Sequence, residues 1–307
     1  MITQDKVSNP TQFYTWEKYN CSYEVQNQNG NNTPLVLIHP IGVGLSRKFW
    51  INFCSEWEKE SNSSHDLNPI YNPDLLGCGD GDMPVMAYNP DFWAKQLKYF
   101  IENIVQNNAK KSVILVVQGA LFTVALELVK IAPDLVEKII ISAPPPYNLI
   151  NENNPEWRKK LAWTIFSSPF GNLFYRYART EKFLRNFSIR RLFYSSEAVD
   201  SQWLNPLISG SRNMASRYAV FSFLAGFWRK NYSDEIKSIQ QPTLIVLGAA
   251  TTSVSKRGIT KTTNEWLADY LGAFPQSQGK IISGRNVLPY ESAVEFVSAV
   301  KSFLVNS

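Results

Sequence analysis

Residues 111–129, KSVILVVQGALFTVALELV, restrict the fold more than any other part of the sequence. A short apolar strand at residues 113–117 is interrupted by Gln118 and Gly119 and continues at once as an apolar helix at residues 120–129. Because no linker separates the two elements, the chain has to turn sharply between them. A buried strand that leads directly into an apolar helix is typical of an α/β core.

The rest of the chain repeats this alternation of strands and helices. Apolar strands are predicted at residues 34–38, 138–142, 242–248 and 280–282, a weaker strand before residue 72, and two edge strands within residues 13–25. Helical spacing of apolar residues predicts helices at 47–59, 91–106, 262–271 and 291–304. The pattern indicates a mostly parallel, doubly wound sheet with helices on both faces.

A helical insertion interrupts this alternation. Three consecutive prolines, Pro144 to Pro146, cannot continue a central strand, and residues 147–235 show helical patterns with many aromatic residues and arginines. We therefore predict a core formed by residues 1–146 and 236–307, with a helical cap at residues 147–235.

Composition restricts the class of protein. With 307 residues, 44% of them hydrophobic and 19% charged, the chain is expected to form one globular core with an insertion. No apolar run approaches the roughly 20 residues that cross a bilayer, and the polar amino terminus does not resemble a signal sequence. Cys21, Cys54 and Cys78 are widely spaced, which predicts reduced thiols and a cytoplasmic protein.

Several motifs occur in an order that resembles the α/β-hydrolase family over nearly the whole chain. LVLIHPIG at residues 35–42 is similar to the family's strand and His-Gly loop, and DLLGCGDGD at 74–82 to its Asp-x-x-Gly-x-Gly turn. VVQGALFTVALELV at 116–129 resembles the nucleophile elbow, G-x-S-x-G, and PDLVEKIIIS at 133–142 the step that follows it. PTLIVLG at 242–248 and GRNVLPYESAVEFVSAVKSFL at 284–304 resemble the segments that carry the acid and the histidine.

The resemblance implies an α/β-hydrolase fold with a cap, and family chemistry is acyl transfer by serine, acid and histidine. Matched position by position, the serine falls at Gly119, the acid at Thr251 and the histidine at Val287. Glycine has no side chain to attack with, threonine carries no negative charge, and valine accepts no proton. The cap sequence SSPFGNLFYRYARTEKFLRNF, residues 167–187, also resembles caps of hydrolase-like proteins from cyanobacteria and plastids.

No other residue is placed to replace the missing triad. His39 opens the oxyanion loop, where the resemblance implies a structural role, and His65 lies in a polar loop. Cys78 is a nucleophile only with a neighbouring base, and no histidine is placed to serve as one. The acidic residues of the turn at residues 74–82 suggest a cation site. The family's equivalent turn is structural, so we predict neither a metal nor a cofactor. These residues are Asp74, Asp80 and Asp82.

The resemblance also implies a polar site, the oxyanion hole, that can hold a ligand. The family's oxyanion hole uses two backbone N–H groups, which match Ala120 and Ile41, although Pro40 replaces the usual glycine. Gly119 adopts the positive φ of the elbow without the strain that a serine has to bear. We predict an apolar site beneath the cap, lined by aromatic cap residues and by Ile41, Gln118, Ala120 and Val287.

The cap carries the positive charge of the chain. Residues 147–235 hold 13 Lys and Arg against 7 Asp and Glu, a net charge of +6 in a chain of +5, and 19 of the 41 aromatic residues. Such a segment packs its aromatics on the core, lines an apolar pocket or meets a membrane surface. Nucleic acid is not expected, because no recognition motif accompanies the charge.

Three functions stay open at this point. The first is a non-catalytic α/β-hydrolase-fold protein that binds a hydrophobic small molecule, a membrane surface or a partner protein. The second is an ester or amide hydrolase with a non-standard catalytic group. The third is a scaffold without a pocket. The oligomeric state is left open, and a peripheral membrane contact is one option for a cytoplasmic chain.

Overall fold

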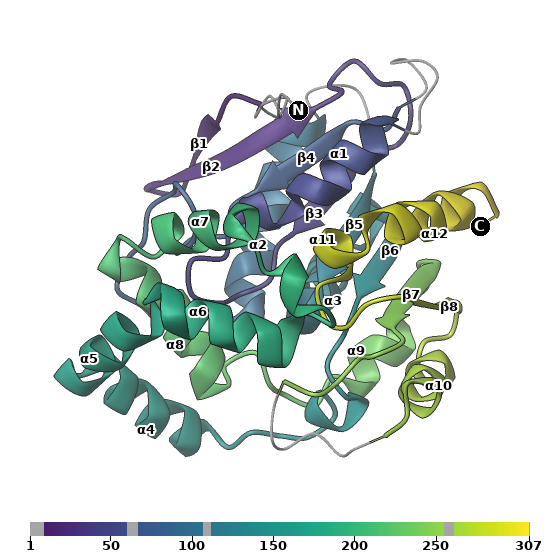
Figure 1. Cartoon of the computed structure of the whole chain (residues 1–307). Helices are drawn as coiled ribbons and strands as arrows, with labels where there is room; N and C mark the ends of the chain where they lie inside the picture. The colour runs from purple at the N-terminus through teal and green to yellow at the C-terminus, as the bar shows by residue number, and fades with distance from the viewer. Residues whose placement is uncertain (1–8, 60–66, 107–111, 255–260, 307) are drawn as a thin grey trace.

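A single eight-stranded sheet forms the centre of the computed structural model, which describes residues 9–59, 67–106, 112–254 and 261–306 (Figure 1). The strand order is β1-β2-β4-β3-β5-β6-β7-β8. Strands β1 and β2 pair antiparallel, β2 pairs antiparallel with β4, and all the other pairs are parallel. The strands are β1 Gln12–Trp16, β2 Tyr19–Gln26, β3 Leu35–Ile38, β4 Ile70–Pro73, β5 Val113–Gln118, β6 Val136–Ser142, β7 Thr243–Gly248 and β8 Ser277–Ile282.

Alternate residues of the central strands serve two apolar cores, one on each face of the sheet. In β5, Leu115 and Val117 belong to the first core, whereas Ile114 and Val116 belong to the second. Helices α2 (Pro90–Phe100), α3 (Phe122–Ile131) and α10 (Thr263–Ala273) cover the first face. Helices α1 (Ile51–Lys59), α11 (Leu288–Glu291) and α12 (Ala293–Asn306) cover the second. The predicted doubly wound α/β sheet is therefore confirmed.

Three predicted helices are divided in the structure. The one expected at 47–59 opens as a 3-10 turn, Arg47–Trp50, before α1, and the one expected at 91–106 ends as the π-helical turn Ile101–Val105. The carboxyl-terminal helix is interrupted at Ser292, where φ is −129° and ψ is 45°, so α11 and α12 are separate. Apolar spacing alone does not reveal such breaks, because the apolar face continues across them.

The segment 147–235 is described throughout and contains helices and turns without a strand. Its helices are α4 Glu156–Ser167, α5 Pro169–Ala178, α6 Glu181–Phe187, α7 Ser201–Gly210, α8 Arg217–Ala225 and α9 Ser233–Ser238. The predicted boundary at residue 235 falls inside α9, which packs against α3. None of the helices within the described ranges is long and apolar enough to cross a membrane.

Candidate functional site

The turn between β5 and α3 has the geometry that the sequence predicts. Gly119 follows the last residue of β5 with φ of +66°, and the 3-10 turn Gly119–Leu121 leads into α3. The predicted positive φ at Gly119 is confirmed. Such a backbone favours glycine, because an L side chain comes too close to the following carbonyl in this conformation.

The position of the missing side chain at Gly119 is open. A Cβ atom built on this glycine has no heavy atom within 4 Å, whereas most other glycines of the structure are tightly enclosed. Gly119 and Ala120 both remain partly exposed although Gln118 and Leu121 are buried. Space for a side chain or for a ligand group therefore exists above the turn, and steric crowding does not explain the glycine.

The loops that carry the three mapped triad positions meet at the carboxyl-terminal edge of the sheet. Gln118 Nε2 donates to the carbonyl of Asn286 at 2.7 Å, which joins the elbow to the loop after β8. Thr251 Oγ1 accepts from the N–H of Gly248 and donates to the carbonyl of Arg285, both at 2.9 Å. The hydroxyl of Thr251 thus joins two loops, and at this position it takes the place of the family's carboxylate.

Val287 and its neighbour Asn286 occupy the loop that carries the histidine in the family. Val287 is buried in the second apolar core. Asn286 is the polar residue that sequence reasoning missed: its Nδ2 donates to the carbonyls of Arg191, at 2.7 Å, and Thr252, at 2.9 Å. The sequence places this polar residue directly before Val287, but its partners lie 34 and 95 positions away and no local pattern indicates them.

The cap is attached at this same loop. The N–H of Asn286 donates to the carbonyl of Leu192 at 3.0 Å, and Arg285 Nη1 reaches the carbonyl of Arg190 at 3.3 Å. Glu291 Oε1 accepts from the N–H of Tyr194 at 2.5 Å, and its Oε2 accepts from the N–H of Arg285 at 2.9 Å. Backbone and side-chain groups at the histidine position therefore hold the cap on the core.

The oxyanion loop after β3 is oriented by His39. The N–H of Leu75 donates to His39 Nε2 at 3.1 Å, so Nε2 is the unprotonated nitrogen and Nδ1–H donates to the carbonyl of Pro40 at 2.9 Å. Burial lowers the pKa of His39, which keeps the ring neutral. In the trans peptide between Pro40 and Ile41, the C=O and the N–H point in opposite directions. Because the ring of His39 binds the C=O, the N–H of Ile41 points away from the ring.

Two polar side-chain atoms beside the elbow are buried without a protein partner in the described part of the chain. Gln118 Oε1 and Ser142 Oγ are both orphaned, and Gln118 and Ser142 are paired residues of β5 and β6. An orphaned buried polar atom costs about 1–3 kcal/mol unless a water or a ligand group reaches it. Ala143, next in the chain, has φ of +44°, a conformation that an L residue adopts only under strain.

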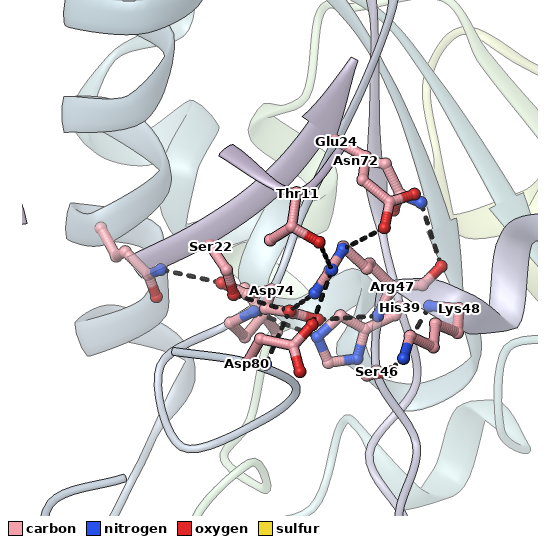
Figure 2. A network of polar contacts seen from close by, with 12 residues as sticks. Thr11, Ser22, Glu24, His39, Ser46, Arg47, Lys48, Asn72, Asp74 and Asp80 are labelled. Atoms are coloured by element: carbon pink, nitrogen blue, oxygen red, sulfur yellow. Dashed lines mark hydrogen bonds and ion pairs between the residues drawn. The ribbon is translucent and has the colours of Figure 1, made fainter. Parts of the chain in front are cut away.

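The acidic turn after β4 is organised by Arg47, which sequence analysis did not single out (Figure 2). The side chain of Arg47 pairs with Asp74, with Glu24 at 2.8 Å and with Asp80 at 2.7 Å. Asp74 Oδ1 also accepts from the N–H of Arg47, at 2.8 Å, and its Oδ2 accepts from Ser22 Oγ, at 2.8 Å. Arg47 and Asp74 are each only 1% exposed, so a buried guanidinium already occupies the centre of this group of carboxylates.

Asp82 is separate from this ion network and binds the N–H of Asn20 at 2.8 Å. Among the described residues, no group of three His, Cys, Asp or Glu side chains is placed to hold a metal. Burial raises the pKa of the Cys78 thiol, and a buried neutral thiol is a poor nucleophile. His65 lies outside the described residues.

Two hollows are found at the junction of core and cap, away from the elbow. The larger, of about 310 Å³, lies between the turn after β4 and the end of α7, and Lys48, Asp80 and Arg212 line it. The smaller, of about 10 Å³, is lined by residues that include Phe49 and Trp203. Neither includes Ile41, Gln118, Ala120 or Val287, so the ligand site beneath the cap stays a prediction.

Comparison with known proteins identifies the family. The model of the alpha/beta hydrolase family matches residues 35–300, and the chain belongs to this family. No curated protein matches the sequence.

Among solved structures, an esterase from Thermogutta terrifontis has a TM-score of 0.71 and 16% identity, with 96% of this chain and 98% of that chain covered. A serine hydrolase of carbazole degradation, CarC, has a TM-score of 0.72 and 18% identity, covering 98% and 100%. The epoxide hydrolase CorEH has a TM-score of 0.72 and 14% identity, covering 96% and 98%. At these identities the similarity establishes the fold alone.

Proposed function

We propose that this chain is a non-catalytic member of the alpha/beta hydrolase family that binds a small apolar molecule at the elbow. One observation carries the proposal: Gly119 keeps the positive φ of a nucleophile elbow and faces open space where a nucleophilic side chain would be. Thr251 and Val287 supply neither an acid nor a base to the same edge of the sheet. The site thus retains its shape without groups that activate a nucleophile.

The ligand we expect has an apolar body and one carbonyl or carboxylate oxygen. The N–H of Ala120 lies in the first turn of its helix and has no acceptor within that helix. The N–H of Ile41 belongs to the peptide that His39 orients. Two such backbone donors bind an oxygen that carries negative or partial negative charge. The partly buried side chains of Ile41 and Ala120 supply apolar contact.

The first test concerns catalysis. Neither the wild-type chain nor Gly119→Ser is expected to hydrolyse p-nitrophenyl esters above a mock-purified control, because a serine stays a weak nucleophile without a base. The control is the triple variant Gly119→Ser, Thr251→Asp, Val287→His, which restores all three mapped groups. Turnover by the wild type that survives substitution of Cys78, His39 and His65 in turn contradicts the proposal and favours a hydrolase with a non-standard catalytic group.

The second test concerns binding. Mass spectrometry of extracts from the purified chain is expected to detect an apolar carboxylic acid or ester, which Gly119→Phe excludes because a side chain at Gly119 enters the open space above the turn. Ser302→Phe, which adds the same ring at an exposed position of α12, is the matched control and retains the molecule. Equal recovery from both variants contradicts a site at the elbow, and recovery of no such molecule from the wild type favours the scaffold without a pocket.

A further inference from the structure

The outermost part of the cap is the helical hairpin formed by α4 and α5. Figure 1 shows these two helices at the edge of the cap farthest from the sheet. Ser168 joins them and caps α5 by accepting from the N–H of Phe170 at 3.2 Å. Gly171 allows the close approach, because a Cβ there would lie 1.8 Å from the carbonyl oxygen of Phe166.

Both helices of this hairpin are apolar on two sides. The inner side packs on the cap: Phe166 stacks on Phe221 at 5.1 Å, and Tyr175 OH lies 2.7 Å from Ser216 Oγ. The outer side carries two rows of exposed apolar residues, called here the hairpin rows. They are Trp157, Leu161 and Ile165 on α4, and Phe170, Leu173, Phe174 and Tyr177 on α5.

The hairpin rows hold seven of the 17 large apolar side chains that are exposed among the described residues. Phe170 is 79% exposed, Leu173 68% and Trp157 63%. A helix that is apolar on both its inner and its outer side needs a further contact, and gathered exposed apolar residues mark interaction surfaces.

Positive charge accompanies the hairpin rows. Residues 157–180 contain no Asp or Glu, and Arg158, Lys160 and Arg176 are exposed. The guanidinium of Arg158 lies over the ring of Trp157 at 5.2 Å. Lys159 does not contribute to this surface, because it is buried and pairs with Glu156 at 2.6 Å.

We propose that the hairpin rows insert into the headgroup region of an anionic lipid membrane. Exposed aromatic and aliphatic side chains beside Lys and Arg are the features that hold a helix in the plane of a membrane interface. Anionic headgroups complement Arg158, Lys160 and Arg176, whereas a second copy of the chain would present the same positive surface to itself across a twofold axis. This surface is independent of the elbow and of the proposed ligand.

The test is sedimentation of the full chain with vesicles of phosphatidylcholine, with and without about one third phosphatidylserine. The chain is expected to bind the anionic vesicles only, and to be released at about 1 M salt, where the Debye length is about 3 Å. Replacing Arg158, Lys160 and Arg176 by Gln is expected to weaken binding about fivefold per residue.

Matched apolar substitutions distinguish binding by the hairpin rows from non-specific adsorption of exposed apolar residues. Phe170→Ser with Leu173→Ser is expected to abolish binding, whereas Val294→Ser with Val305→Ser, at exposed positions of α12, leaves it unchanged. Circular dichroism verifies that both variants are folded. Binding that survives loss of Phe170 and Leu173 overturns the assignment of the hairpin rows.

Trp157 provides a readout that does not depend on these variants. It is the only one of the nine tryptophans that is exposed, and all nine lie in the described ranges. Brominated anionic lipids are expected to quench tryptophan emission in the wild type and much less in Trp157→Phe, which still sediments. Equal quenching in both proteins, no sedimentation at low salt, or a dimer in analytical ultracentrifugation that Phe170→Ser and Leu173→Ser dissociate overturns the proposal.

Discussion

At Gly119, the backbone conformation and the space available to a side chain have separate effects on a substitution. The residue has φ of +66° and room for a Cβ, so a substitution there meets strain in the backbone and no clash. A catalytic serine has to bear that strain in return for its exposed hydroxyl. In the proposed non-catalytic protein, no hydroxyl is needed at this position, and glycine adopts the conformation without that strain.

A pair of glycine substitutions tests this reading. Gly119→Ala is expected to lower the free energy of unfolding by about 1–2 kcal/mol, the cost of placing an L residue in the left-handed region. Gly272→Ala is the control, since Gly272 lies in α10 and a Cβ there also meets nothing within 4 Å. It is expected to stabilise the protein by about 0.5–1 kcal/mol. Urea denaturation measures both values, and equal effects contradict a backbone origin.

Sequence reasoning reached Gly119 because the elbow is a local pattern of strand, turn and helix. Arg47 and Asn286 were missed because their contacts are not local. Arg47 binds Asp74, which is 27 positions away in the sequence, and Asn286 donates to the carbonyl of Arg191, which is 95 positions away. A single arginine at the start of a helix or an asparagine in a polar loop has the appearance of a surface residue until the fold brings its partners together.

At the scale of elements, the ion network of Arg47 connects three segments of the chain that are distant in sequence. Glu24 belongs to β2, Asp74 follows β4, and Arg47 begins the 3-10 turn before α1 (Figure 2). Asn72 Nδ2 adds a bond to the carbonyl of Arg47 at 3.0 Å. The network therefore holds the antiparallel edge of the sheet against the helix that covers the second core.

Removing the charge of Arg47 is expected to be costly. Arg47→Met leaves Asp74 buried without its cation and should lower the free energy of unfolding by about 3–5 kcal/mol. The control is Lys95→Met, which breaks the exposed pair with Asp91 and is expected to cost no more than about 0.5 kcal/mol. Adding Asp74→Asn to Arg47→Met should recover part of the loss, because the uncompensated charge is gone. Strictly additive losses contradict a direct charge pair.

The elements that sequence predicted well are those buried on both sides. Strands β3, β5 and β7 are continuous apolar runs, and their ends agree with the predicted ends within one residue. Strand β8 begins three residues before its predicted start, because its first residues, Ser277 to Lys280, include no large apolar side chain and are partly or fully exposed at the edge of the sheet. An edge strand needs fewer apolar residues, so its hydrophobic pattern indicates its limits less clearly.

For the whole molecule, cap and core share their apolar interior. Ile150, Tyr218 and Trp228 of the cap belong to the first core, and Phe193 and Trp203 to the second. The cap's own cluster of buried residues consists of Tyr175, Val220 and Phe221. Three buried side chains do not offset the conformational entropy of ordering 89 residues, which is of order 1–2 kcal/mol per residue for the backbone alone.

Polar bonds at the base of the cap add to this shared interior. The N–H of Tyr232 donates to the carbonyl of Ile150 at 2.9 Å, which closes the two ends of the insertion on each other. Lys230 then pairs with the buried Glu127 of α3 at 2.5 Å and with Glu235 at 2.9 Å. The helix that follows the elbow is therefore tied directly to the end of the cap.

Cap and core are accordingly expected to unfold together. Urea denaturation followed by far-UV circular dichroism and by tryptophan fluorescence should give coincident transitions, since tryptophans lie in both parts of the chain. A fragment of residues 147–235 expressed alone should lack the near-UV signal of packed aromatic rings, because most of its buried side chains have their partners in the core. A separate transition of the cap at lower urea, or a folded fragment, would show instead that the insertion is an independent domain.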